Sequence, residues 1–190
     1  MRKDRQLRMI PCDYAAREED GKKYIEGYFA VFGSNYELWP GATESVAPTA
    51  FDGALSDDIR CLIDHETRLV LGRNTVGTLY LRVDERGLWG RVEINENDTD
   101  AMNLYARVQR GDVSQCSFGF EILDEETEYR EDGTVHWTIK KVKLYEVSIV
   151  TFPAYKDTGV QARKAEFDHM KQRRAEAFRE KCMRRLKKHA

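Results

Sequence analysis

Short runs of β-branched and aromatic residues, separated by turn residues, fill most of the first 150 positions of the chain. This pattern is typical of β-strands bounded by turns. Two turn segments, DERG at residues 84–87 and the dipeptide Asp132-Gly133, each lie between two such runs and predict hairpins of antiparallel strands. The clearest predicted strands cover residues 24–32, 59–64, 78–83 and 88–94.

Two segments have helical periodicity. Residues 50–55 predict a short helix after a Pro-Thr pair, and residues 98–110 predict a longer one, because their apolar side chains recur every three or four positions. Asp98 is a suitable N-cap for the longer helix, and Gly111 is a suitable terminator.

The C-terminal residues 161–190 form a segment of different composition. They hold 11 Lys or Arg against 4 Asp or Glu, a net charge of +7, which leaves −9 for the rest of a chain whose total is −2. We expect a basic amphipathic helix here, outside the main domain. Its apolar stripe at helical spacing consists of Phe167, Met170, Phe178, Cys182 and Leu186.

The order of these elements determines the expected fold class. At least six strands and only one or two helices precede residue 160, without the regular alternation of a βαβ fold. We therefore predict a mainly β fold, a closed or nearly closed antiparallel β-barrel decorated by α-helices, over residues 1–160. A helical tail over residues 161–190 follows it. A length of 190 residues with 41% hydrophobic content suits one core-bearing domain of this kind.

Composition excludes several classes of protein. No run approaches the roughly 20 apolar residues of a membrane span, and the first residues do not resemble a signal peptide, so we expect a soluble cytoplasmic protein. The four cysteines have no CxxC or metal-finger spacing, so we expect reduced thiols and no metal or organic cofactor.

Ser117 is the first residue that could carry chemistry. It lies in the strand-like run VSQCSFGFEIL, where alternation puts Ser117 and Gly119 on one face. The missing side chain at Gly119 would let another backbone approach beside the hydroxyl. From the pattern alone, an ordinary strand serine is the simpler interpretation. The larger side chains share the opposite face: Cys116, Phe118, Phe120 and Ile122.

A serine nucleophile needs a base, and the strongest candidate is His65. It ends the run IRCLIDH just before the polar ETR, whereas His136 belongs to a hairpin that looks exposed and the other two histidines lie in the basic tail. Glu146, an acidic residue within the apolar KLYEVSIV, could orient that histidine. From the pattern alone, a salt bridge between Glu146 and a lysine on a neighbouring strand is the simpler interpretation.

Six separated motifs, in order, resemble one family. GYFAVF, APTAFDGAL, IDHETRLVLGR, TLYLRVDERGL, VQRGDVSQCSFGF and LYEVSIVTFPAY are similar to motifs of the prohead proteases of tailed bacteriophages, over about residues 24–158. The resemblance implies a fold related to that of the herpesvirus capsid maturation proteases. It also implies a serine endopeptidase that cleaves the major capsid protein and its scaffolding segment inside the prohead, in the host cytoplasm.

The same resemblance assigns roles to residues of this chain. It implies Ser117 as nucleophile, His65 as general base and Glu146 as the third member, with His136 as the rival to Glu146 because the herpesvirus relatives use a second histidine. Cys116 raises the alternative of a thiol nucleophile, which alternation disfavours by placing it on the aromatic face. Backbone N–H groups at Gly72 and Arg73 are candidates for the oxyanion hole.

Further interactions follow from the same implied function. Self-cleavage and a homo-oligomer are additional candidates, and the basic tail is a candidate for docking on acidic scaffold or for being trimmed. We expect no membrane and no nucleic-acid partner, because phosphate would repel a body of charge −9. The alternative function is a non-enzymatic capsid assembly factor with the same fold.

Overall fold

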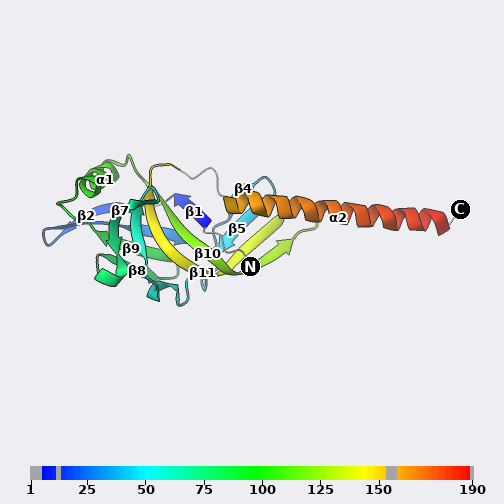
Figure 1. The fold of residues 1–190 in the computed structure, drawn as a ribbon, viewed down its shortest axis with the longest axis horizontal. Helices are drawn as coiled ribbons and strands as arrows, with labels where there is room; N and C mark the ends of the chain where they lie inside the picture. Colours follow the sequence, from blue (N-terminus) through cyan, green and yellow to red (C-terminus); the bar gives the residue numbers. More distant parts are fainter. Residues whose placement is uncertain (1–5, 12–13, 153–157, 189–190) are drawn as a thin grey trace. The chain divides into compact units, whose positions relative to one another are not determined.

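The computed structural model describes residues 6–11, 14–152 and 158–188 (Figure 1). The chain consists of two compact units, Met1–Tyr155 and Lys156–Ala190. All strands found in the described residues belong to the first unit. The strands are β1 (Gln6–Pro11), β2 (Ala15–Glu19), β3 (Lys22–Val31), β4 (Tyr36–Trp39), β5 (Ala42–Val46), β6 (Arg60–Ile63), β7 (Glu66–Arg73), β8 (Leu79–Val83), β9 (Gly87–Glu93), β10 (Gln115–Tyr129) and β11 (Val135–Val150).

The helices confirm one prediction and correct another. Helix α1 (Thr99–Arg110) begins at Asp98, whose side chain accepts hydrogen bonds from two backbone N–H groups, and ends at Gly111 in the left-handed region, as predicted. The helix predicted at residues 50–55 is wrong. Only the 3-10 turn η1 (Ala54–Ser56) forms there, because Gly53 adopts a φ of 76° and the segment is too short to nucleate an α-helix. A second such turn, η2 (Asn74–Val76), follows β7.

The strands form two sheets. The larger has seven strands in the order β1-β10-β11-β5-β4, with β6 pairing to both β11 and β7, and the smaller has the order β2-β3-β9-β8. Both predicted hairpins, β8–β9 and β10–β11, are present and antiparallel. The prediction of a mainly β fold with few helices is therefore confirmed.

The prediction of an antiparallel barrel needs correction. Strand β11 pairs in parallel with β5 near its start and with β6 near its end. Within the described ranges, the strand ladders make two separate sheets and do not close into a ring. Irregularities after Gly119 and around Asp124 curve the long β10–β11 hairpin, whose two ribbons run side by side in Figure 1.

The core lies between the two sheets, where β1 and β10 contact β3, and β7 contacts β8 and β9. Cys116, Phe118 and Phe120 are fully buried here, as alternation predicted. The rings of Phe118 and Phe120 stack with centroids 4.7 Å apart, and Phe51 meets Phe118 edge-on at 5.7 Å. This aromatic layer supports one face of β10 and leaves the other face for polar side chains.

The second unit contains helix α2 (Thr158–Lys188), which confirms the predicted helical tail. Phe178 is 67% exposed, so this part of the predicted apolar stripe faces outward. The side chains of Cys182 and Leu186, which were also assigned to that stripe, lie outside the described ones. The proposed division of the chain at residue 160 stays a prediction. Of the helices that the structure describes, none is long and apolar enough to cross a membrane.

Candidate active site

The polar face of the β10–β11–β6 segment brings the predicted site residues together. Ser117 pairs with Ser148 on β11, and Gly119 pairs with Glu146. Paired residues, and residues two apart on one strand, point to the same side of a sheet. Ser117, Ser148 and Glu146 therefore share one face, and the bare backbone of Gly119 lies between the serine and the carboxylate positions.

His65 reaches this face from a tight turn. Asp64 and His65 form the two-residue connection between β6 and β7, and their φ angles are 48° and 62°. Two consecutive positive φ values are typical of a type I′ hairpin turn, but they are strained for residues other than glycine.

Hydrogen bonds from the end of β11 hold this turn. The Asp64 carboxylate accepts from the N–H of Thr151 at 2.6 Å and from its hydroxyl at 3.1 Å. The Asp64 N–H donates to the carbonyl of Ile149 at 3.0 Å. These bonds stabilise a backbone conformation that aims the neighbouring imidazole back toward β11.

A chain of short hydrogen bonds connects His65 to the sheet. Its Nδ1 lies 2.7 Å from Oε1 of Glu146, and the Ser148 hydroxyl donates to Oε2 of the same carboxylate at 2.6 Å. Glu146 is 2% exposed, so both contacts are shielded from water. A buried carboxylate needs such partners, because burial of an uncompensated charge is costly.

The remaining polar atoms of the site lack partners. Among the described residues, neither Oγ of Ser117 nor Nε2 of His65 has a hydrogen bond, although both atoms are buried. The two are therefore not hydrogen-bonded to each other in this state. Catalytic hydrogen bonds are often long without substrate. Buried polar atoms without a partner are uncommon in native folds.

Ser117 is less accessible than its sequence context suggested. Alternation correctly separates it from the aromatic layer, but its exposed fraction is 0%, so the hydroxyl is not open to solvent in this conformation. A pocket of about 290 Å³ adjoins the site at Glu146 and is large enough for a side chain of a bound peptide. Its other lining residues are Asp58, Arg60, Leu62, Thr67 and Tyr145.

Cys116 and Cys61, the two cysteines whose side chains are described, are both poor rivals to Ser117. Cys116 takes part in a disulfide bond, which corrects the expectation of reduced thiols, and its sulfur lies 3.0 Å from the carbonyl oxygen of Tyr28 on β3, on the core side of β10. Cys61 is a free, buried thiol. Burial, and then the charge of Glu146, raise the pKa of the Cys61 thiol, so it stays protonated and unreactive. Cys12 lies outside the described residues.

His136 lies far from this face. It pairs with Glu128, eleven residues along β10 from Ser117, which corresponds to about 36 Å of extended strand. Its two ring nitrogens are 2.8 Å from the hydroxyl of Thr43 and 2.9 Å from that of Ser45. The expectation of an exposed hairpin histidine is wrong, because His136 is 9% exposed and burial lowers its pKa.

The candidate oxyanion donors are also remote. Gly72 and Arg73 lie on β7, three strands from β10, a separation of about 14 Å at the usual strand spacing. The Arg73 N–H donates to the Thr78 hydroxyl at 2.9 Å. A side chain at Gly72 would collide with Val92 at 2.6 Å, so packing against β9 explains this glycine.

Two supporting residues were missed by the sequence analysis. Ser148 could have been found from its place two positions after Glu146 on the same strand. Asp64 has a weaker signal, because an Asp-His pair predicts a left-handed turn only once the strands on both sides are known to pair.

Together the fold and the site define a class: a two-sheet β protein in which a serine, a histidine and a carboxylate share one sheet face. Residues 11–173 match the model of the Caudovirus prohead serine protease family, and the chain belongs to that family. Over 151 residues it is 30% identical to the prohead protease of Enterobacteria phage HK97, covering 77% of this chain and 63% of that protein.

One further relative and one solved structure are similar. The prohead protease of Escherichia phage T5 is 31% identical over 108 residues, covering 57% of this chain and 47% of that protein. The chain thus spans less than two thirds of the length of either curated relative. The solved structure of the bacteriophage T4 capsid assembly protease is 13% identical, with a TM-score of 0.49, covering 80% of this chain and 100% of that one.

Proposed function

We propose that this chain is a serine endopeptidase with Ser117 as nucleophile, His65 as general base and Glu146 as the orienting carboxylate. The observation that carries the proposal is the 2.7 Å contact between Nδ1 of His65 and Glu146. That contact leaves Nε2 as the nitrogen available to a serine on the same face. The rival assignment of His136 as the third member loses support, since hydroxyl groups engage both of its nitrogens.

The mechanism follows from these roles. Glu146 accepts a hydrogen bond from the protonated Nδ1 of His65. This bond selects the tautomer of His65 that has a lone pair on Nε2. That lone pair takes the proton of Ser117 as its oxygen attacks a peptide carbonyl carbon, and the imidazolium then returns the proton to the leaving amine. A water molecule, deprotonated by the same nitrogen, then attacks the acyl carbon, and the imidazolium returns the proton to the Ser117 oxygen as the bond to the acyl group breaks. The bond from Ser148 holds the carboxylate in place throughout.

The proposed substrates are capsid proteins. The family and the two named relatives support the major capsid protein and its scaffolding segment as substrates, cleaved inside the prohead in the host cytoplasm. Self-cleavage and a homo-oligomer belong to the same proposal. The pocket next to Glu146 is the nearest place for a substrate side chain. Because Ser117 is buried in the present conformation, substrate binding has to expose it.

Co-expression of the chain with the capsid protein of the same phage tests the proposal. Ser117→Ala should abolish cleavage of the capsid protein, read by intact-mass spectrometry, while the exposed serine variant Ser56→Ala should cleave at the normal rate. Undiminished cleavage by a folded Ser117→Ala protein would overturn the assignment. Particles that assemble normally with no cleavage by the native chain would instead support the non-enzymatic assembly factor.

A further inference from the structure

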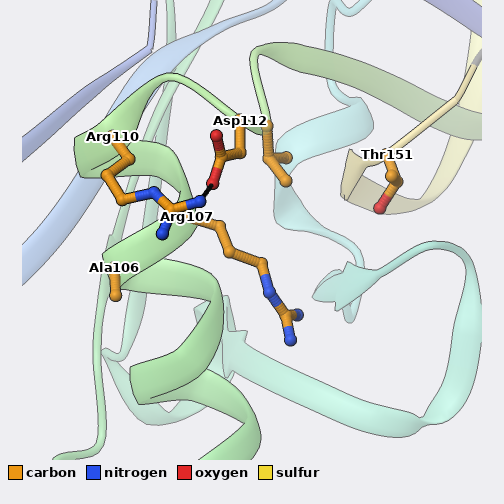
Figure 2. A pocket seen from close by; sticks show the side chains of 6 residues that line it. Ala106, Arg107, Arg110, Asp112 and Thr151 are labelled. Carbon is orange, nitrogen blue, oxygen red and sulfur yellow. Dashed lines mark hydrogen bonds and ion pairs between the residues drawn. The ribbon is translucent and has the colours of Figure 1, made fainter.

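A second pocket lies beyond the end of β11, separate from the one at Glu146. It has a volume of about 440 Å³ and is formed by the last turns of α1, the segment that leads into β10, and Thr151 (Figure 2). Its lining residues are Ala106, Arg107, Arg110, Asp112, Val113 and Thr151. We call it the Arg107 pocket.

The Arg107 pocket is coupled to the candidate active site through one residue. Thr151, which lines the pocket, donates through its N–H and its hydroxyl to Asp64, the neighbour of His65 in the strained turn. Thr151 lies three residues beyond Ser148, which pairs with Ser117. At about 3.3 Å per residue along β11 and one strand spacing across to β10, the backbone of Thr151 lies about 11 Å from that of Ser117, roughly the length of three residues of an extended peptide.

The charge in the pocket is positive and incompletely paired. Arg110 forms an ion pair with Asp112. Arg107 is exposed, its guanidinium has no hydrogen bond or ion pair within the part of the chain that the structure describes, and Figure 2 shows it directed away from the Arg110–Asp112 pair. A guanidinium binds a carboxylate through two parallel hydrogen bonds, a geometry that a lone ammonium or amide does not match.

We propose that the Arg107 pocket is a substrate subsite that binds an acidic side chain, Asp or Glu, about three residues from the scissile bond. This inference rests on the proposed endopeptidase function, because the pocket gains its meaning from its distance to Ser117. The guanidinium of Arg107 supplies the two hydrogen-bond donors for the carboxylate. Thr151 lines the pocket and also donates to Asp64, so a side chain bound in the pocket influences the turn that positions His65.

Cleavage profiling with the full chain tests the subsite. A library of proteome-derived peptides is incubated with the native protein, and new N-termini are identified by mass spectrometry, with Ser117→Ala defining the background. The variants are Arg107→Gln and Arg107→Glu, and the matched control is Arg130→Gln, an arginine at the far tip of the β10–β11 hairpin. Paired peptides that differ only by Glu or Gln at the proposed position give kcat/KM for each protein.

The native protein and Arg130→Gln should favour the Glu peptide about two- to fivefold, the effect of one charged pair near the surface. Arg107→Gln should cut both peptides at the same rate, and Arg107→Glu should favour a basic residue at that position. An acidic preference that survives in Arg107→Gln, or its absence from the native profile, would overturn the subsite alone. Native protein that shows no Ser117-dependent cleavage would overturn the proposed function, and the subsite with it.

Discussion

The contact between His65 and Glu146 makes Glu146→Gln the most informative single substitution. The glutamine is isosteric, so its carbonyl oxygen can still accept from Nδ1 of His65 and its amide can donate to the Ser148 hydroxyl. The hydrogen-bonded geometry is retained, and only the negative charge is lost. The variant therefore separates the electrostatic role of the carboxylate from its structural role.

The size of the effect follows from Coulomb's law. When His65 takes the serine proton, its positive charge lies about 4 Å from the negative charge of Glu146. The attraction between two such charges is about 4 kcal/mol at an effective dielectric constant of 20. Loss of this interaction in the transition state lowers kcat about a thousandfold. The free energy of unfolding should change by less than about 1 kcal/mol. The substitution removes the cost of burying the Glu146 charge and, at the same time, the attraction between that charge and His65, and these two changes largely cancel.

The assay measures two quantities on each variant. Initial rates of capsid-protein cleavage give the loss of activity, and urea unfolding followed by fluorescence gives the loss of stability. Ser148→Ala is the comparison, since it removes one hydrogen bond to a buried carboxylate and should cost about 1.5–3 kcal/mol of stability with a smaller loss of rate. A Glu146→Gln protein that keeps more than a tenth of the native rate would refute the charge argument.

Three other predictions concern the surrounding fold. Asp64→Ala should lower the free energy of unfolding by about 2–3 kcal/mol and reduce the cleavage rate, because the left-handed turn loses its hydrogen bonds to Thr151. Asp64→Asn should lower the free energy of unfolding by less, and equal unfolding midpoints for the two variants would contradict this. His136 has a lowered pKa in the folded protein, so below pH about 6.5 the unfolded chain binds more protons than the folded one. The free energy of unfolding should therefore fall as the pH falls, by at most about 1.4 kcal/mol per pH unit for this group. In urea melts at several pH values, His136→Gln should make this slope shallower. Gly90→Ala should destabilise the domain by about 1–3 kcal/mol in thermal melts, since its β-carbon would meet Phe29 at 2.6 Å; an unchanged midpoint would show that the ring moves aside freely.

Local signals predicted many of the elements correctly. Helix α1 forms between the residues that cap it, Asp98 and Gly111, because capping depends on neighbours within a few positions. The hairpins at residues 84–87 and 132–133 have the same origin. The helix predicted at residues 50–55 failed because Gly53 adopts a positive φ and six residues are too few to nucleate an α-helix.

Features that depend on pairing between distant segments were not predicted. The parallel pairing of β11 with β5 buries His136, which looked exposed from its place in a hairpin. Its partners Thr43 and Ser45 are more than ninety residues away in the chain. The disulfide of Cys116 was missed for a similar reason, because cysteine spacing does not record which strands the fold brings together.

The sequence by itself determined which face of β10 carries Ser117, since alternation along a strand is a local property, and its motifs indicated the family. Only the tertiary structure decided that Glu146, and not His136, meets His65. These two residues are 81 positions apart, and the parallel pairing of β6 with β11 and the left-handed Asp64–His65 turn bring them to 2.7 Å. Strand register between distant segments is set by the packing of the whole core, which no short stretch of sequence encodes.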